Sequence, residues 1–92
     1  MNTKIEVEKL DETRYRVHLT DSESQSSHQV TLQAEDRNRI CGARIGPEEL
    51  IRRSFEFLLE REPKESILRR FDLSVISRFF PKFEAEMMRR IH

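Results

Sequence analysis

The first third of the chain alternates between apolar and polar residues with a period of two. The alternation defines three segments separated by short polar stretches, and the strands it predicts are Ile5–Lys9, Tyr15–Thr20 and His28–Gln33. Alternation of this kind is typical of strands that bury one face and expose the other. Because the links are short, we expect an antiparallel three-stranded meander.

The hairpin between the second and third segments decides where two of the three histidines point. A tight turn pairs Leu19 with either His28 or Val30, and both registers place His28 on the apolar face and His18 on the solvent face. The two rings should therefore point apart. No Cys or His lies at the short spacing of zinc ligands, so we expect no metal site.

From Gly46 onward the apolar residues recur at helical spacing. Pro47 and the two glutamates after it are typical of a helix start, and the residue before Pro63 disfavours helical backbone. The predicted helix is Pro47–Arg61, with Phe55 near the centre of its apolar stripe.

Shorter helices are expected on both sides of this one. Before it, Glu35–Ile40 predicts one helical turn ended by Gly42. After it, the pattern predicts a short helix over Ser66–Phe71, a third that begins at an Asp72 N-cap and ends at Pro81, and a last amphipathic helix with a stripe of Phe83, Met87 and Ile91.

Together these elements predict one α+β domain over residues 1–92. We expect the three-stranded antiparallel meander to be covered on one face by three to four short α-helices. Hydrophobic residues make up 36% of the chain and charged residues 37%, so the core is small and the surface highly charged. A core of this size leaves room for a homodimer interface to complete it.

Composition and chemistry exclude several function classes. The net charge is zero, which disfavours nucleic-acid binding driven by bulk electrostatics. The only cysteine, Cys41, cannot form an intramolecular disulfide, and the N-terminus contains no apolar signal-peptide core, so we expect a cytoplasmic protein.

We also expect no enzyme, no cofactor and no small-molecule substrate. The two glycines form no phosphate-binding loop, and no catalytic signature surrounds Cys41. Glutamate and arginine stand four residues apart on the central helix, at the spacing of weak surface ion pairs. These pairs are Glu49 with Arg53 and Arg52 with Glu56.

The C-terminal third contains more large apolar residues than a short helical tail can bury within itself. Candidate partner-binding residues are Phe79, Phe80, Phe83, Met87 and Met88. Most of this stripe should cover the meander, and the remainder would form a surface for a protein partner or a second copy of the chain. Phe80 and Met88 fall off the main stripe and are the stronger surface candidates.

A nucleic-acid regulator is the alternative hypothesis. The solvent side of the third strand carries Gln29, Thr31 and Gln33, and helices follow it, which faintly resembles the ribbon-helix-helix repressors. Two strands precede this strand, however, the helix after it is short, and its outward residues include no Arg or Lys.

A second resemblance covers about two thirds of the chain. The run LLEREPKESILRRFDL, within Glu49–Leu73, is similar to a family of small uncharacterised bacterial proteins, and the similarity continues through Ser74–Pro81 and back to His28–Thr31. The resemblance implies a bacterial source and a compact fold. It implies no activity, cofactor or site residue.

Overall fold

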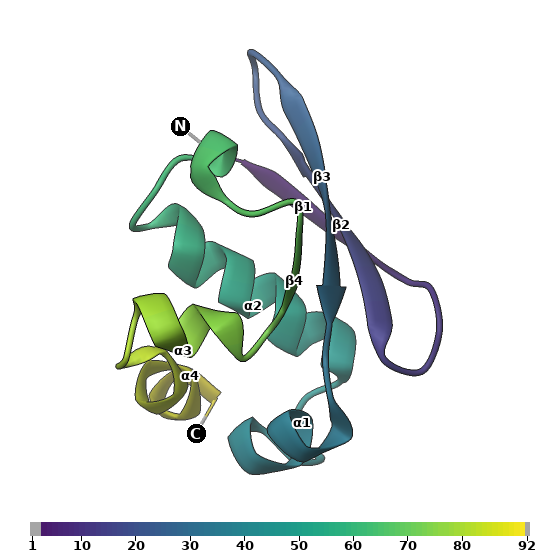
Figure 1. The fold of residues 1–92 in the computed structure, drawn as a ribbon, viewed down its shortest axis with the longest axis vertical. Helices are drawn as coiled ribbons and strands as arrows, with labels where there is room; N and C mark the ends of the chain where they lie inside the picture. Colours follow the sequence, from purple (N-terminus) through teal and green to yellow (C-terminus); the bar gives the residue numbers. More distant parts are fainter. Residues whose placement is uncertain (1–2, 92) are drawn as a thin grey trace.

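The computed structural model describes residues 3–91, which fold into a four-stranded mixed sheet with helices on one face (Figure 1). The α+β class is therefore confirmed, with one more strand than expected. In chain order the elements are β1 (Lys4–Lys9), β2 (Arg14–Thr20), β3 (Gln25–Thr31), α1 (Ala34–Ile40), α2 (Pro47–Leu59), η1 (Lys64–Ser66, a 3-10 helix), β4 (Arg70–Asp72), α3 (Val75–Phe79) and α4 (Phe83–Ile91).

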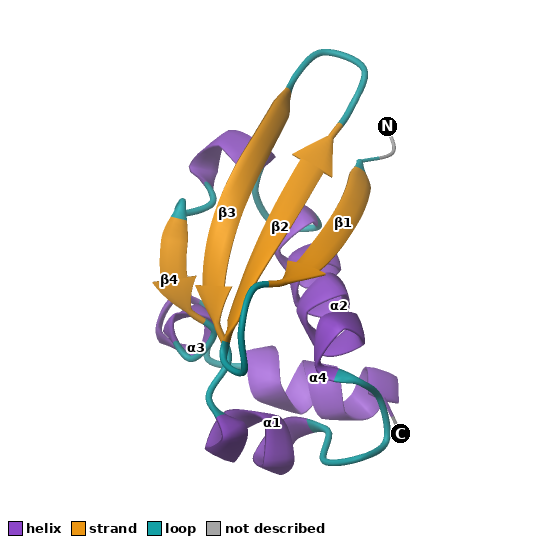
Figure 2. Ribbon diagram, turned by 90° about the vertical axis from the view of Figure 1, so that its right-hand side faces the viewer, coloured by secondary structure: helices purple, strands orange, loops and turns teal. Residues whose placement is uncertain are grey.

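The first three strands form the expected antiparallel meander, and Figure 2 shows its solvent face. The register of the second hairpin differs from both predicted alternatives, because Leu19 lies opposite Ser26 and Val17 lies opposite His28. Asp21 explains the difference. Its Oδ1 accepts the backbone N–H groups of Glu23 and Ser24 at 2.9 and 3.0 Å, so the turn closes early and β3 begins at Gln25 rather than His28.

The predicted helix over Ser66–Phe71 is wrong. After the single turn of η1 the chain extends into β4, which pairs with β3 in the parallel sense. The N–H of Gln29 donates to the carbonyl of Arg69 at 2.7 Å, and the N–H of Leu73 donates to that of Thr31 at 2.9 Å. Six residues are too few for apolar spacing to separate a helix from a buried strand.

Helix α2 lies across the inner face of the sheet, and Phe55 is at the centre of the contact. Its ring centroid is 5.7 Å from that of His28 and 6.0 Å from that of Phe71. The helix starts at Pro47 as expected but ends at Leu59, before the predicted Arg61. The buried residues of α2 are Leu50, Ile51, Ser54, Phe55, Phe57 and Leu58.

A second layer of packing joins α2 to the C-terminal helices. The Phe57 ring lies 5.8 Å from Phe80 and 5.2 Å from Phe83, in edge-on contacts with both. The Arg61 guanidinium covers the same ring at 3.6 Å, which is a cation–π contact. Because α2 is buried on two sides, α3 and α4 complete the core instead of forming a separate tail.

Gly42 and Asp72 lie at two of the helix boundaries. Gly42 has φ +55°, and its N–H donates to the carbonyl of Arg37 at 2.9 Å, so it ends α1 in the left-handed conformation that favours glycine. Asp72 is not the N-cap of α3, since that position is Ser74. The Asp72 carboxylate instead accepts the backbone N–H of Ser74 at 3.0 Å.

Candidate functional site

The structure separates the five predicted partner-binding residues into different environments. Phe83 and Met87 are 1% and 0% exposed, so both belong to the core. Phe80 and Met88 are half-buried, with Phe80 packed against Phe57. Phe79 is 67% exposed, and it is the one member of the set whose ring is largely open to solvent.

A second exposed apolar side chain accompanies Phe79. Leu68 is 50% exposed, and these two are the large hydrophobic residues left exposed in residues 3–91. Sequence reasoning placed Leu68 inside a helix, where it would have shared a stripe with Ile67 and Phe71. In the extended segment before β4, neighbouring side chains point to opposite sides, so Ile67 is buried and Leu68 is not.

Leu68 and Phe79 line an apolar groove of about 300 Å³. The groove lies where η1, β4 and α3 follow one another beside the C-terminal end of α2 (Figure 1). Its volume is at the lower end of the range for binding pockets, enough for one or two large side chains. The lining residues are Leu58, Glu62, Ser66, Ile67, Leu68, Phe71, Val75, Ile76, Phe79 and Phe80.

His28 fixes the wall of this groove from the sheet. Its Nδ1 lies 2.7 Å from the carbonyl oxygen of Leu68, and its Nε2 lies 2.9 Å from the hydroxyl of Ser26. A carbonyl can only accept a hydrogen bond, so Nδ1 carries the proton and Nε2 is left to accept from Ser26. Burial lowers the pKa of His28, which keeps the ring neutral.

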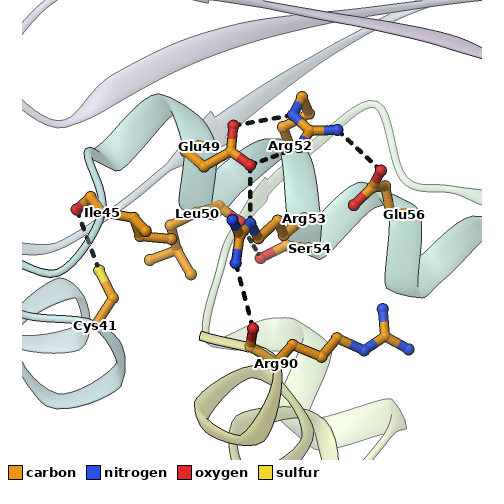
Figure 3. A network of polar contacts seen from close by, with 9 residues as sticks. All are labelled: Cys41, Ile45, Glu49, Leu50, Arg52, Arg53, Ser54, Glu56 and Arg90. Atoms are coloured by element: carbon orange, nitrogen blue, oxygen red, sulfur yellow. Dashed lines mark hydrogen bonds and ion pairs between the residues drawn. The ribbon is translucent and has the colours of Figure 1, made fainter. Parts of the chain in front are cut away.

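Two acidic residues of α2, Glu49 and Glu56, are engaged by arginines (Figure 3). The two predicted ion pairs are confirmed: Arg53 Nε lies 2.8 Å from Glu49, and Arg52 Nη1 lies 2.8 Å from Glu56. A hydrogen bond from Arg52 is the main cause that lowers the pKa of Glu49 to about 2. A carboxylate held so firmly in its charged form is poorly suited to proton transfer near neutral pH.

Cys41 has the environment of a structural thiol. Its side chain is buried, and its Sγ lies 3.7 Å from the carbonyl oxygen of Gly42. The same Sγ lies 3.8 Å from the carbonyl oxygen of Ile45 (Figure 3). Burial raises the pKa of the thiol, whereas a nucleophilic cysteine needs a lowered one. Within the described part of the chain, no cluster of His, Cys, Asp or Glu has the arrangement of a metal site.

The residues of the nucleic-acid alternative lie along the solvent face of the sheet. Gln29 is flanked by Arg16 on β2 and Arg70 on β4, so this face carries arginines that the pattern of one strand could not show. Thr31 lies between Arg14 and Asp72, and Gln33 Nε2 donates to the Asp72 carboxylate at 3.2 Å. Because β3 pairs along both edges, only its face is open to a ligand.

Comparison of the chain with protein-family models, curated proteins and solved structures finds no match. The function must therefore be argued from the geometry. No helix between residues 3 and 91 has both the length and the apolar character needed to cross a membrane. The apolar groove is the strongest candidate site, because it combines a concave shape with exposed large hydrophobic residues.

Proposed function

We propose that the protein is a small, non-catalytic interaction module that binds an apolar segment of a partner protein in the Leu68–Phe79 groove. The observation that carries the proposal is the exposure of Leu68 and Phe79 on the wall of that groove. In this proposal the protein acts in the cytoplasm and requires no cofactor.

The physical argument rests on the cost of exposed apolar surface. Burial of such surface contributes about 25 cal/mol per Å², so a fold with a nearly complete core gains by covering a remaining apolar patch. The rest of the core is closed, since Phe55, Phe57, Phe83 and Met87 are all at most 1% exposed. The groove is thus a local feature of a well-packed molecule, which favours a binding role.

A peptide-display selection tests the proposal. An unbiased random library is selected on the wild-type protein, and each enriched peptide is then measured against a Leu68→Gln/Phe79→Ser variant. We expect enriched peptides that share an apolar anchor and bind at least about tenfold more weakly to the variant. A Lys9→Gln/Glu12→Ser variant, altered at exposed positions of the β1–β2 hairpin, is the matched control and should retain binding.

Selection that yields no peptide sensitive to the groove substitutions would refute the proposal. Both substituted positions are exposed, so the variant should fold normally, and this is checked by its thermal midpoint. Chemical-shift perturbation then places the bound peptide. The amides around Leu68 and Phe79 should shift, while those of the β1–β2 hairpin should not.

The nucleic-acid alternative has one observation in its favour, which is the pair of arginines beside Gln29. Arg16 forms an ion pair with Glu8, with 3.6 Å between Nη1 and Oε1. Arg70 has no ion-pair partner in residues 3–91. Gel shifts at low salt on DNA and RNA test it. Retardation that Arg70→Gln weakens would support a nucleic-acid regulator, and no retardation at low salt would exclude one.

A further inference from the structure

We infer that the partner segment is acidic and binds in an extended conformation along the free edge of β4, with an apolar side chain in the groove. This inference rests on the proposed function and specifies its partner. Two independent observations support it: the charges around the groove and the unpaired main-chain groups of β4.

The first observation concerns positive charge. Arg69, Arg78 and Lys82 make no ion pair with any residue of the range 3–91, whereas the arginines of α2 and α4 are all paired. Each of the three stands within two positions of a residue that lines the groove. On α3, Arg78 is three residues after the lining residue Val75, so the two side chains lie on the same side of the helix.

One acidic residue belongs to the groove itself. Glu62, three residues after the end of α2, lines it without an ion pair among the described residues. Arg70 and Asp72 flank Phe71 on β4, so their side chains point to the solvent face of the sheet and not toward the groove. Three unpaired cations against one carboxylate leave the surroundings of the groove positive, although the whole chain has no net charge. Charge complementarity therefore favours a segment that carries Asp or Glu beside its apolar anchor.

The second observation concerns the edge of the sheet. The carbonyl of Arg69 and the N–H of Leu73 form hydrogen bonds with β3. Successive residues of a strand direct their main-chain groups to opposite edges, so those of Arg70 and Asp72 point away from β3. In the described chain, β4 ends the strand order β1-β2-β3-β4, and no strand pairs with its outer edge. Figure 2 shows β4 at the open side of the sheet.

An extended segment can use both features at once. Added strands bind an open edge through main-chain hydrogen bonds, and alternate side chains enter pockets beside that edge. Phe71 faces the core from β4 and lines the groove, so the edge and the groove belong to the same strand. An apolar side chain of the added segment would enter the groove, and its acidic neighbours would meet the arginines.

The same charges argue against a second copy of the chain as the occupant. A two-fold interface uses the same surface patch on both copies. Such an interface at the groove would bring Arg69 and Arg78 of one copy close to those of the other. Like charges facing one another across strands are destabilising, so we expect an acidic partner of different sequence.

Two biased libraries of short displayed peptides test the inference. Both carry random apolar residues at alternate positions. The intervening positions are Asp or Glu in one library and Lys or Arg in the other. We expect the acidic library to yield groove-dependent binders that weaken about tenfold or more between low and high salt, and the basic library to yield none.

Charge-reversal variants then locate the effect. Arg69→Glu/Arg78→Glu should weaken the acidic peptides by about tenfold or more, whereas Lys9→Glu/Arg44→Glu, with the same change in net charge, should alter binding by less than about twofold. Lys9 and Arg44 are exposed cations outside the groove lining, and neither has an ion pair in residues 3–91, so they are a matched control. A proline at the central backbone position of a peptide should abolish binding if the peptide adds as a strand.

The outcomes separate this inference from the proposed function. Equal enrichment of both libraries, equal effects of the two charge-reversal variants, or tolerance of the proline would overturn the inference while the groove remained a binding site. The inference would also be overturned if the unbiased library yielded groove-dependent binders and the two biased libraries yielded none. Absence from all three libraries would overturn the proposed function itself.

Discussion

At the scale of single residues, the two phenylalanines Phe55 and Phe79 have opposite roles. Phe55 is 0% exposed and contacts both His28 and Phe71, whereas Phe79 is mostly in solvent. Residue type alone could not distinguish them. The position of Phe55 on the apolar stripe of a long amphipathic helix identified it as a core residue.

We predict that Phe55→Ala lowers the free energy of unfolding by about 3–5 kcal/mol, because it removes a buried ring and leaves a cavity. Phe79→Ala is the matched control and should change it by less than about 0.5 kcal/mol. Urea denaturation followed by circular dichroism measures both. A loss below about 1 kcal/mol for Phe55→Ala would mean that the contact between α2 and the sheet is not the centre of the core.

His28 makes a prediction about pH. Its pKa in the folded state is lowered by burial, from an ordinary value of 6.5. Well above pH 6.5 the ring is neutral in both states and its stabilising contribution is complete. As the pH falls toward the folded pKa, the unfolded chain takes up a proton that the buried ring resists, so stability should fall between pH 7.5 and 5.

The free energy of unfolding of His28→Asn should depend less on pH over the same interval. Asparagine can donate to the Leu68 carbonyl but does not titrate. His18→Asn, which removes an imidazole from the solvent face of the sheet, is the matched substitution. A wild-type slope in His28→Asn would assign the effect to another group. The carboxylates with lowered pKa titrate mainly below this interval.

At the scale of elements, long periodic segments were predicted well and short ones were not. The meander and α2 have enough repeats for period two and period 3.6 to be distinguished, and both were found near the expected bounds. The three residues of β4 have no such length. β4 is a strand because it forms hydrogen bonds with β3, which is about forty residues away in the sequence.

The candidate site followed from the sequence only in part. An apolar excess near the C-terminus indicated a contact surface and included Phe79. It also included Phe83 and Met87, because a sequence pattern cannot show that Phe57 gives α2 a second buried side. Leu68 was missed for the same reason as β4.

The β2–β3 turn is joined to η1 by one buried cation. Lys64 Nζ lies 2.6 Å from Asp21 Oδ2, and the hydrogen bond it donates is the main cause that lowers the pKa of Asp21 to about 2. A lowered carboxylate pKa stabilises the fold above its ordinary value of 3.8, and this contribution is lost as the pH falls toward 2.

We therefore predict that Lys64→Met lowers the urea midpoint at pH 7 and that its difference from wild type shrinks as the pH approaches 2. Lys4→Met is the control, since Lys4 and Glu6 form an exposed pair at 3.9 Å and its loss should change little. A difference that stays constant from pH 7 to 2 would show that Lys64 acts through packing instead of charge.

At the scale of the whole molecule, balanced charge conceals an uneven distribution. The arginines of α2 and α4 are neutralised by nearby glutamates in local pairs, while several cations near β4 and α3 remain unpaired. Net charge counted from the sequence therefore understates the electrostatic character of the groove.

We predict that the protein sediments as a single chain at micromolar concentration in low salt, because repulsion between the groove cations opposes symmetric association. Analytical ultracentrifugation measures this. A dimer that Leu68→Gln/Phe79→Ser dissociates would instead identify a second copy as the occupant of the groove, and a dimer unaffected by that variant would point to another surface.

The parallel pairing of β3 with β4 has a consequence for synthesis in the cell. The two strands are separated by about forty residues, and translation at roughly 5–20 residues per second leaves about 2–8 s between their emergence from the ribosome. During that interval the nascent meander has an uncovered inner face and an unpaired edge at Gln29 and Thr31. Nascent chains should be most vulnerable to aggregation and most dependent on chaperones at that stage.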